Sequence, residues 1–255
     1  MKSPTERFSD RVDNYAKYRP GYPEPLVRLL QEKVAPPAVV ADIGSGTGIL
    51  TRQLLDAGYE VYGVEPNAPM RSAAEQSLGG NPLFHTVSGT AEITLLADLS
   101  VDLITAAQAF HWFKADPTKA EFRRILKPGG SLAIIWNERV DDISEVNRRW
   151  KHILQTLAPE YPKEYHRNID VDAIRAFFAP GSMMLTKFDN KQVLDREALI
   201  GRFLSSSYVP NVGEPGFEEI ISAVKDLFDD CQVDGYITIT YQTHVYWGTW
   251  EDNKR

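Results

Sequence analysis

Cysteine is almost absent from this chain. Its 255 residues include only one cysteine, Cys231. A single cysteine excludes an intramolecular disulfide and any CxxC metal site. The five histidines, at positions 85, 111, 152, 166 and 244, show no metal-ligand spacing. We therefore expect no metal site.

Long apolar runs and an excess of positive charge are also missing. No stretch reaches about 18 apolar residues, and residues 1–15 lack the apolar core of a signal peptide. With 28 basic and 35 acidic residues the net charge is −7, so no broad field that attracts nucleic acid is expected. These absences favour a cytoplasmic protein with neither a membrane nor a nucleic-acid partner, as a monomer or a homodimer.

The first half of the chain alternates strand and helix patterns. Near-continuous apolar segments with helical patterns between them predict a parallel sheet covered by helices. A glycine and proline cluster at 127–130 is expected to end the helix before the fifth segment. The predicted strands are residues 39–43, 60–64, 83–87, 101–106 and 131–136.

The second half is helical with aromatic residues, and it ends in a long segment of period two. Residues 184–194 and 236–247 are predicted to be strands added at the sheet edge. We expect a single domain over 1–255 that contains a core and insertions. Its predicted parts are an N-terminal cap segment at 1–36, a cofactor-binding core at 37–137, helical substrate-side insertions at 138–182 and 195–232, and strands at 183–194 and 236–247 that complete the sheet.

A glycine-rich segment follows the first predicted strand. It reads Asp42-Ile43-Gly44-Ser45-Gly46-Thr47-Gly48, and such glycines let the backbone turn sharply and approach a ligand. A dinucleotide fingerprint needs a third glycine where Ile49 stands, and the Lys-Ser/Thr ending of a phosphate-binding loop is also lacking. A tight strand–helix turn without a ligand is the alternative interpretation.

Glu65 ends the second predicted strand, 21 residues after Gly44. In an open α/β sheet, ligands lie beyond the carboxyl ends of the strands. A carboxylate there can accept hydrogen bonds from both hydroxyls of a ribose. Nicotinamide enzymes use an acid similarly, so Glu65 indicates a ribose without choosing the cofactor. A solvated charge at a helix N-terminus is the alternative.

Further motifs follow these two in a fixed order. With them, the chain resembles the class I S-adenosylmethionine-dependent methyltransferase family, small-molecule type, over about Phe8 to Trp136. The resemblance implies a Rossmann-like seven-stranded α/β sheet, mostly parallel with an antiparallel last strand, helices on both faces and a helical lid. It also implies the cofactor S-adenosyl-L-methionine. The further motifs are residues 64–67, 89–92, 101–104, 107–113 and 126–130.

The resemblance also implies roles for single residues. Glu65 would hold the ribose, and Asp42 with the backbone of Gly44 and Gly46 would serve the methionine end. Many relatives have Asp where this chain has Thr90, so the contact to the adenine amino group would pass to Glu92 or to a water. The remaining implied cofactor residues are Ser45, Pro66, Asn67, Met70, Ala91 and Gln108, the last of which would line the cleft where methyl transfer occurs.

The N-terminal segment offers a further contact to the cofactor. By the same resemblance, Tyr15, Tyr18 and Arg19 would reach the carboxylate of the methionine moiety. A guanidinium suits a carboxylate because it can bind both oxygens. A segment whose aromatic residues only pack is the equally weighted alternative.

His111 and Trp112 are the predicted substrate-side residues. His111 is a candidate general base, but we favour a wall residue that closes the pocket with Trp112. Transfer would be in-line and mainly positional, to an oxygen, nitrogen or carbon atom, and a carboxylate acceptor would need no base. Several aromatic residues of the second half would roof a small ligand or simply form the core: Trp150, Tyr161, Tyr165, His166, Phe177, Tyr208 and Tyr246.

Three other functions compete with this one. A DNA cytosine methyltransferase needs a cysteine nucleophile, and Cys231 lies in an acidic helix-end context. A nicotinamide-dependent oxidoreductase needs the missing glycine and a proton donor. A non-catalytic module that binds S-adenosylmethionine would carry the same motifs, so this alternative stays open.

Overall fold

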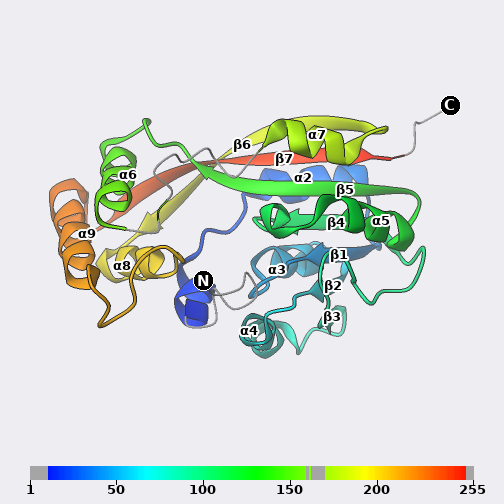
Figure 1. The fold of residues 1–255 in the computed structure, drawn as a ribbon, viewed down its shortest axis with the longest axis horizontal. Coiled ribbons are helices and arrows are strands. Elements are labelled where there is room, and N and C mark those ends of the chain that lie inside the picture. The colour runs from blue at the N-terminus through cyan, green and yellow to red at the C-terminus, as the bar shows by residue number, and fades with distance from the viewer. Residues whose placement is uncertain (1–10, 159–160, 162–169, 251–255) are drawn as a thin grey trace.

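A seven-stranded mixed sheet forms the centre of the computed structural model, which describes residues 11–158, 161 and 170–250. The strand order is β3-β2-β1-β4-β5-β7-β6 (Figure 1). Strand β7 is antiparallel to both of its neighbours, and the other pairs are parallel. The predicted sheet is therefore confirmed. The strands are β1 Val39–Ile43, β2 Glu60–Val64, β3 Phe84–Val87, β4 Val101–Ala107, β5 Leu126–Arg139, β6 Ser182–Leu194 and β7 Ile237–Thr249.

Helices cover both faces of the sheet. None of the helices in the described ranges is long and apolar enough to cross a membrane. Helices α1 and α2 lie in the N-terminal segment and were not among the predicted elements. The helices are α1 Val12–Tyr18, α2 Glu24–Lys33, α3 Ile49–Asp56, α4 Ala68–Leu78, α5 Ala115–Ile125, α6 Glu145–Leu157, α7 Val171–Phe178, α8 Arg196–Leu204 and α9 Phe217–Cys231.

The central strands are apolar because both of their faces are buried. Val40 and Val61 pack in one cluster with Leu30 of α2 and Leu54 of α3. On the opposite face, the α5 and α7 side chains pack on the neighbouring strand residues. Helix α7 lies within segment 138–182, predicted to be on the substrate side, but it belongs to the layer that covers the sheet.

Strand β5 is longer at both ends than the predicted 131–136. Its first residue, Leu126, pairs with Val101, and the register then shifts so that Ser131 pairs with Leu103. The glycine and proline cluster at 127–130, expected to follow the helix as a stop, is therefore an irregularity inside the strand. At the other end, β5 continues to Arg139 because β7 pairs with it there.

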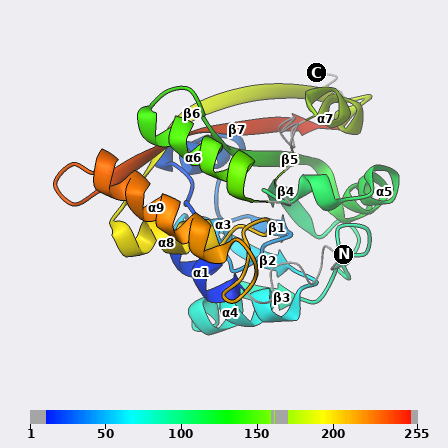
Figure 2. The same cartoon turned by 60° about the vertical axis from the view of Figure 1, so that its left-hand side comes forward.

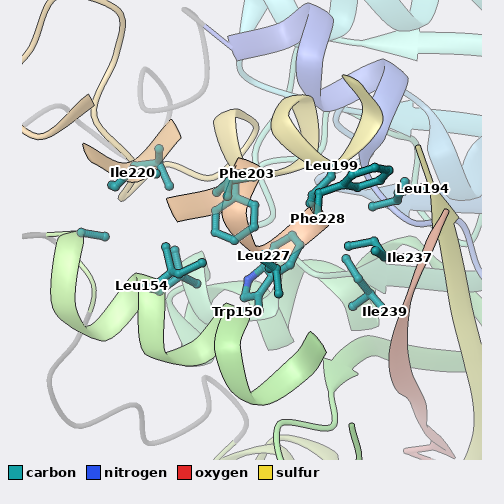
Figure 3. Packing of buried hydrophobic residues seen from close by; sticks show 14 of the residues in the cluster. Trp150, Leu154, Leu194, Leu199, Phe203, Ile220, Leu227, Phe228, Ile237 and Ile239 are labelled. Carbon is teal, nitrogen blue, oxygen red and sulfur yellow. The ribbon is translucent and has the colours of Figure 1, made fainter. Parts of the chain in front are cut away.

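Helices α6, α8 and α9 form a second layer, which we call the cap. They pack on the ends of β6 and β7 that extend beyond the central sheet (Figures 1 and 2). Trp150 of α6 is stacked on Phe203 of α8, with ring centroids 3.8 Å apart (Figure 3). The cap therefore has an apolar core of its own. Full burial of one such side chain contributes about 1.5–3 kcal/mol to stability.

Helix α1 joins the cap to the cofactor-binding half predicted from the sequence. It packs on α8 and also contacts α4. A Cβ atom on Gly201 of α8 would lie 2.1 Å from the ring of Tyr18, so only glycine permits this approach. Arg11 and Arg19 donate hydrogen bonds to the carbonyls of Leu204 and Ser205, where a helix C-terminus attracts positive charge.

Candidate functional site

The glycine segment forms a tight turn between β1 and α3. Gly44, Gly46 and Gly48 have φ values of +68°, +58° and +84°, which glycine adopts without the strain of other residues. The backbone N–H groups of Gly44 and Ser45 donate to the carbonyl of Val64 over 2.8 and 3.3 Å. The turn is thereby fixed against the carboxyl end of β2.

The segment that follows β4 passes close to the glycine turn. A Cβ atom on Gly44 would lie only 2.6 Å from the Cβ atom of Ala109. The glycine is therefore required by both its backbone conformation and the space around it.

Glu65 reaches the turn from the next strand. Its Oε2 accepts a hydrogen bond from the Gly46 N–H over 2.9 Å, and its Oε1 accepts one from the Asn67 N–H over 2.8 Å. Burial raises the pKa of Glu65, and the two hydrogen bonds oppose this shift. The structure thus places the predicted ribose acceptor directly against the glycine turn.

Asp42 lies beneath the turn and is buried. Its Oδ2 accepts a hydrogen bond from the Thr51 hydroxyl over 2.7 Å, and its Oδ1 accepts one from Thr105 over 2.8 Å. Burial raises the pKa of Asp42 to about 6, and both hydroxyls oppose that rise. The carboxylate connects β1 with α3 and β4, so it supports the turn from below. Its contact with a methionine moiety stays a prediction.

The raised pKa of Asp42 predicts a pH-dependent stability. Between its ordinary pKa of 3.8 and the folded value of about 6, the folded protein binds more protons than the unfolded chain. Stability contributed by this group therefore falls as the pH rises through that window, by up to about 3 kcal/mol. Asp42→Asn cannot ionise, so its unfolding free energy relative to wild type should increase by this amount between pH 4 and 7.

Urea unfolding at several pH values measures this difference. Asp56→Asn, at the exposed end of α3, is the matched control, because it makes the same chemical change at an exposed position. A difference between Asp42→Asn and wild type that does not change with pH would contradict the assignment of a raised pKa to Asp42.

The residues after Glu65 begin helix α4. Asn67 is its N-cap, and its Oδ1 accepts a hydrogen bond from the Met70 N–H over 2.9 Å. Met70 is buried, and its Sδ lies 3.6 Å from the position of a Cβ on Gly46. The Pro66 carbonyl faces Arg71, whose Nη1 is 3.5 Å away. These residues therefore continue the site along the side of the turn.

The loop after β3 contains the residues assigned to the adenine. The Thr90 hydroxyl accepts a hydrogen bond from the Ile93 N–H over 3.2 Å. Ala91 is buried in the sheet core. Glu92 Oε1 accepts from the Lys114 N–H over 2.9 Å, and such hydrogen bonds outweigh the effect of burial and lower its pKa. Both polar side chains thus have contacts within the protein.

Gln108 at the end of β4 has a strained backbone. Its φ is +57°, a left-handed conformation that is uncommon outside glycine and concentrated at functional sites. Its N–H donates to the Ile135 carbonyl over 2.9 Å, and its Nε2 donates to the Asn137 carbonyl over 3.0 Å. Pairing with β5 therefore holds this strained residue in place.

His111 and Trp112 lie in a short 3-10 helix, Phe110–Trp112, after Gln108. The His111 ring is 4.4 Å from the Trp112 ring and 5.1 Å from the ring of Trp136. His111 and Trp112 are exposed, while Trp136 is buried. Trp136 was not predicted as a site residue, because its place in an apolar strand resembles ordinary core.

The residues of helix α1 and its C-terminal end contact both the cap and the predicted cofactor-binding core. The guanidinium of Arg19 lies 4.7 Å from the Tyr15 ring centroid. Burial, and then the charge of Arg202, lower the pKa of Arg19. Tyr18 donates a hydrogen bond to Glu197 of α8 over 2.7 Å, so its hydroxyl faces the cap.

Tyr22 is a site neighbour that was not predicted. Burial raises the pKa of its hydroxyl, and the nearby Tyr15 and Asp42 raise it further, while Arg19 lowers it. The Tyr22 hydroxyl thus lies near enough to both Arg19 and Asp42 for their charges to act on it. Its place in the Arg19-Pro20-Gly21-Tyr22-Pro23 motif was the available signal.

The predicted aromatic residues separate into different places. Trp150 and Tyr161 are buried in the cap core with Tyr208 against it, and Phe177 and Tyr246 are buried in the sheet core. Tyr165 and His166 lie outside the described residues, as do residues 8–10 of the N-terminal motif. Groups of three or more His, Cys, Asp or Glu side chains that could hold a metal do not occur in the described part of the chain.

Most of the predicted cofactor residues therefore lie at or just beyond the carboxyl ends of β1, β2, β3 and β4, whereas Tyr15, Tyr18 and Arg19 lie in the N-terminal segment. Strand order reverses between β1 and β4, and ligands of open α/β folds bind at such a reversal. The geometry defines an α/β protein with a candidate binding site at this edge.

Comparison with known proteins agrees with this geometry. A family model for a methyltransferase domain matches residues 41–134. An uncharacterized methyltransferase of Mycobacterium tuberculosis is 39% identical over 134 residues, which is 52% of each chain. One from a Geobacillus strain is 31% identical over 182 residues, 64% of this chain and 83% of the relative. The chain thus spans about half the length of the Mycobacterium relative it matches.

Solved structures show the same fold along most of the chain. A methyltransferase-fold structure from Anaeromyxobacter dehalogenans has a TM-score of 0.72 and 26% identity, covering 91% of this chain and 98% of that one. A phosphoethanolamine N-methyltransferase of Haemonchus contortus, solved with S-adenosylhomocysteine, has a TM-score of 0.57 at 15% identity, covering 97% and 58%. This chain belongs to the class I S-adenosylmethionine-dependent methyltransferase family.

Proposed function

We propose that this protein transfers a methyl group from S-adenosylmethionine to a small-molecule acceptor. The observation that carries the proposal is the contact of Glu65 with the Gly46 N–H at the reversal of strand order. It brings a carboxylate against the backbone of the glycine turn, where on this proposal a ribose and a methionine moiety would meet. The Haemonchus neighbour solved with S-adenosylhomocysteine has the same fold and supports the cofactor by analogy.

Two buried polar atoms near this point support the fit of the cofactor. The Thr47 hydroxyl, inside the glycine turn, and Arg19 Nε have no hydrogen-bond partner among the described residues. Buried polar groups normally have partners, so both atoms suit a ligand that supplies acceptors. Glu65 would bind the ribose, Arg19 the carboxylate, and the turn backbone the rest of the methionine moiety.

The cofactor would supply the activated methyl carbon, and the protein positions the acceptor. Gln108, held by β5, limits how the acceptor can approach along the end of β4. Helix α1, which packs on α8 of the cap and contacts α4, would help to exclude water from the site. Orientation alone can supply a large part of the rate enhancement for such a transfer.

The first prediction of this function concerns ligand-dependent stability. S-adenosylhomocysteine at about 100 times its dissociation constant should stabilise the folded protein by roughly 2.7 kcal/mol, while NAD should not. Thermal unfolding with each ligand measures the effect. Stabilisation by NAD alone would favour the oxidoreductase alternative. Cofactor binding without methyl transfer to a broad panel of metabolites would favour the non-catalytic module.

A second prediction separates the two interpretations of His111. The exposed ring is tilted against the rings of Trp112 and Trp136, which fits a wall residue, so His111→Gln should lose less than about tenfold in single-turnover rate. Trp112→Ala is the control, because it damages the wall without affecting proton transfer. A loss above about a hundredfold, with the acidic limb of the pH profile abolished, would make His111 a general base.

A further inference from the structure

Two arginine side chains meet where α1 packs on α8 of the cap. Arg19 Nη2 donates to the backbone carbonyl of Ser205 over 2.8 Å, and Arg202 Nη1 faces the hydroxyl of the same serine at 3.3 Å. Ser205 is fully buried, and Arg202 is only 7% exposed. The charge of Arg202 is therefore buried, and the half-buried Arg19 lies close to it.

Neither arginine has a carboxylate partner in the described part of the chain. Arg202 contacts only neutral groups, the hydroxyls of Ser205 and Ser206 and the ring of Trp150. Its Nε has no hydrogen-bond partner there. The mutual repulsion is visible at Arg19, where the charge of Arg202 adds to burial in lowering the pKa.

Arg139 lies in the same region, but its positive charge is paired with a carboxylate. Its guanidinium lies 5.6 Å from the Trp150 ring, and that of Arg202 lies 5.5 Å from the same ring. Arg139 Nε, however, donates to Asp141 over 2.8 Å. Attraction to an aromatic face compensates only a small part of the cost of burying a charge, so Arg202 stays unbalanced where Arg139 does not.

The charges of the cofactor would balance only one of the two arginines. The carboxylate of the methionine moiety is one anionic group, and Arg19 is the arginine nearer to the glycine turn, because Tyr22 lies close to both Arg19 and Asp42. Arg202 lies farther into the cap, beside Trp150. A second anion is therefore needed on the acceptor side.

We propose that Arg202 binds a carboxylate group of the acceptor, which makes the substrates of this enzyme small organic acids. This inference rests on the proposed function. A guanidinium with adjacent serine hydroxyls suits the two oxygens of a carboxylate. A carboxylate also matches the single uncompensated charge, and the Trp150 ring offers an apolar wall beside it.

The first test measures thermal stability without ligand. Arg202→Met removes a buried, unpaired charge and keeps the apolar length of the side chain. Its melting temperature should equal that of wild type or exceed it by up to about 4 °C. Arg139→Met is the control and should lower the melting temperature, because Asp141 then keeps only Lys151 at 3.5 Å. A large loss of stability in Arg202→Met would assign Arg202 a structural role and overturn the proposal.

The second test uses the protein saturated with S-adenosylhomocysteine. Linear and aromatic carboxylic acids at millimolar concentration are compared with their primary amides. Carboxylates, but not the matched amides, should raise the melting temperature of wild type. Arg202→Met should abolish this response. Arg202→Lys keeps the charge but cannot bind both carboxylate oxygens as a guanidinium does, so it should retain part of the response. Equal effects of acids and amides, a response that persists in Arg202→Met, or a response to alkyl phosphates alone would overturn the proposal.

A third measurement separates this inference from the proposed function. Arg202→Met should weaken the binding of S-adenosylhomocysteine much less than Arg19→Met does, because Arg19 is the arginine proposed to bind the cofactor carboxylate. Equal weakening by both variants would place Arg202 at the cofactor and overturn the acceptor assignment. Failure of wild type to bind S-adenosylhomocysteine would instead overturn the proposed function, and that is seen before any carboxylate is added.

Discussion

Gly44→Ala is expected to lower both the stability of the protein and its affinity for S-adenosylhomocysteine. The new Cβ atom would lie 2.6 Å from that of Ala109, on a backbone with a φ of +68°. A left-handed backbone costs about 1–2 kcal/mol for a residue other than glycine, and overpacking adds about 1–3 kcal/mol. Relief of the clash must move the glycine turn away from the end of β4.

The displaced turn would shift Gly46 away from Glu65 and misplace the backbone groups proposed to contact the charged methionine moiety. Loss of one or two such contacts to a charged group, at about 1.5 kcal/mol each, corresponds to an affinity about 10–100 times weaker. Urea unfolding and calorimetric titration with S-adenosylhomocysteine measure the two effects.

Gly129→Ala is the matched control for this substitution. Gly129 has a φ of +77°, but no described atom lies within 4 Å of its Cβ position. Gly129→Ala therefore loses stability from the left-handed backbone conformation but not from a steric clash, and it should bind S-adenosylhomocysteine like wild type. Equal losses in both variants would show that the contact with Ala109 is relieved without cost.

Glu65→Ala is expected to weaken S-adenosylhomocysteine binding with the fold retained. The substitution removes the acceptor proposed for the ribose hydroxyls and leaves the N–H groups of Gly46 and Asn67 without their partner. Loss of hydrogen bonds to a charged group costs about 1.5–3 kcal/mol, or about 10–150-fold in affinity. Calorimetric titration gives the change directly.

A modified ligand shows whether the ribose is the cause. The 2′-deoxy analogue of S-adenosylhomocysteine should bind wild type more weakly than the parent compound, and Glu65→Ala should bind both nearly equally. Glu75→Ala, an exposed residue of α4 whose carboxylate accepts from Thr86, is the control and should keep the preference of wild type. Unchanged affinity in Glu65→Ala would remove Glu65 from the site.

The sequence by itself determined the central sheet and the glycine turn. Strands β1 and β2 have the predicted bounds, since a strand buried on both faces needs continuous apolar residues over a short range. The glycine turn and Glu65 could also be predicted from the sequence, because glycine spacing after a strand and an acid at the end of the next strand are local patterns.

Only the tertiary structure decided the extent of β5, the docking of α1 and the place of Arg202. Strand β5 reaches Arg139 because β7, about a hundred residues later, pairs with it. The ring of Tyr18 packs directly against Gly201 of α8, and no local sequence pattern predicts this contact. Whether a buried arginine is balanced depends on which distant side chains surround it, and this information exists only once the chain has folded.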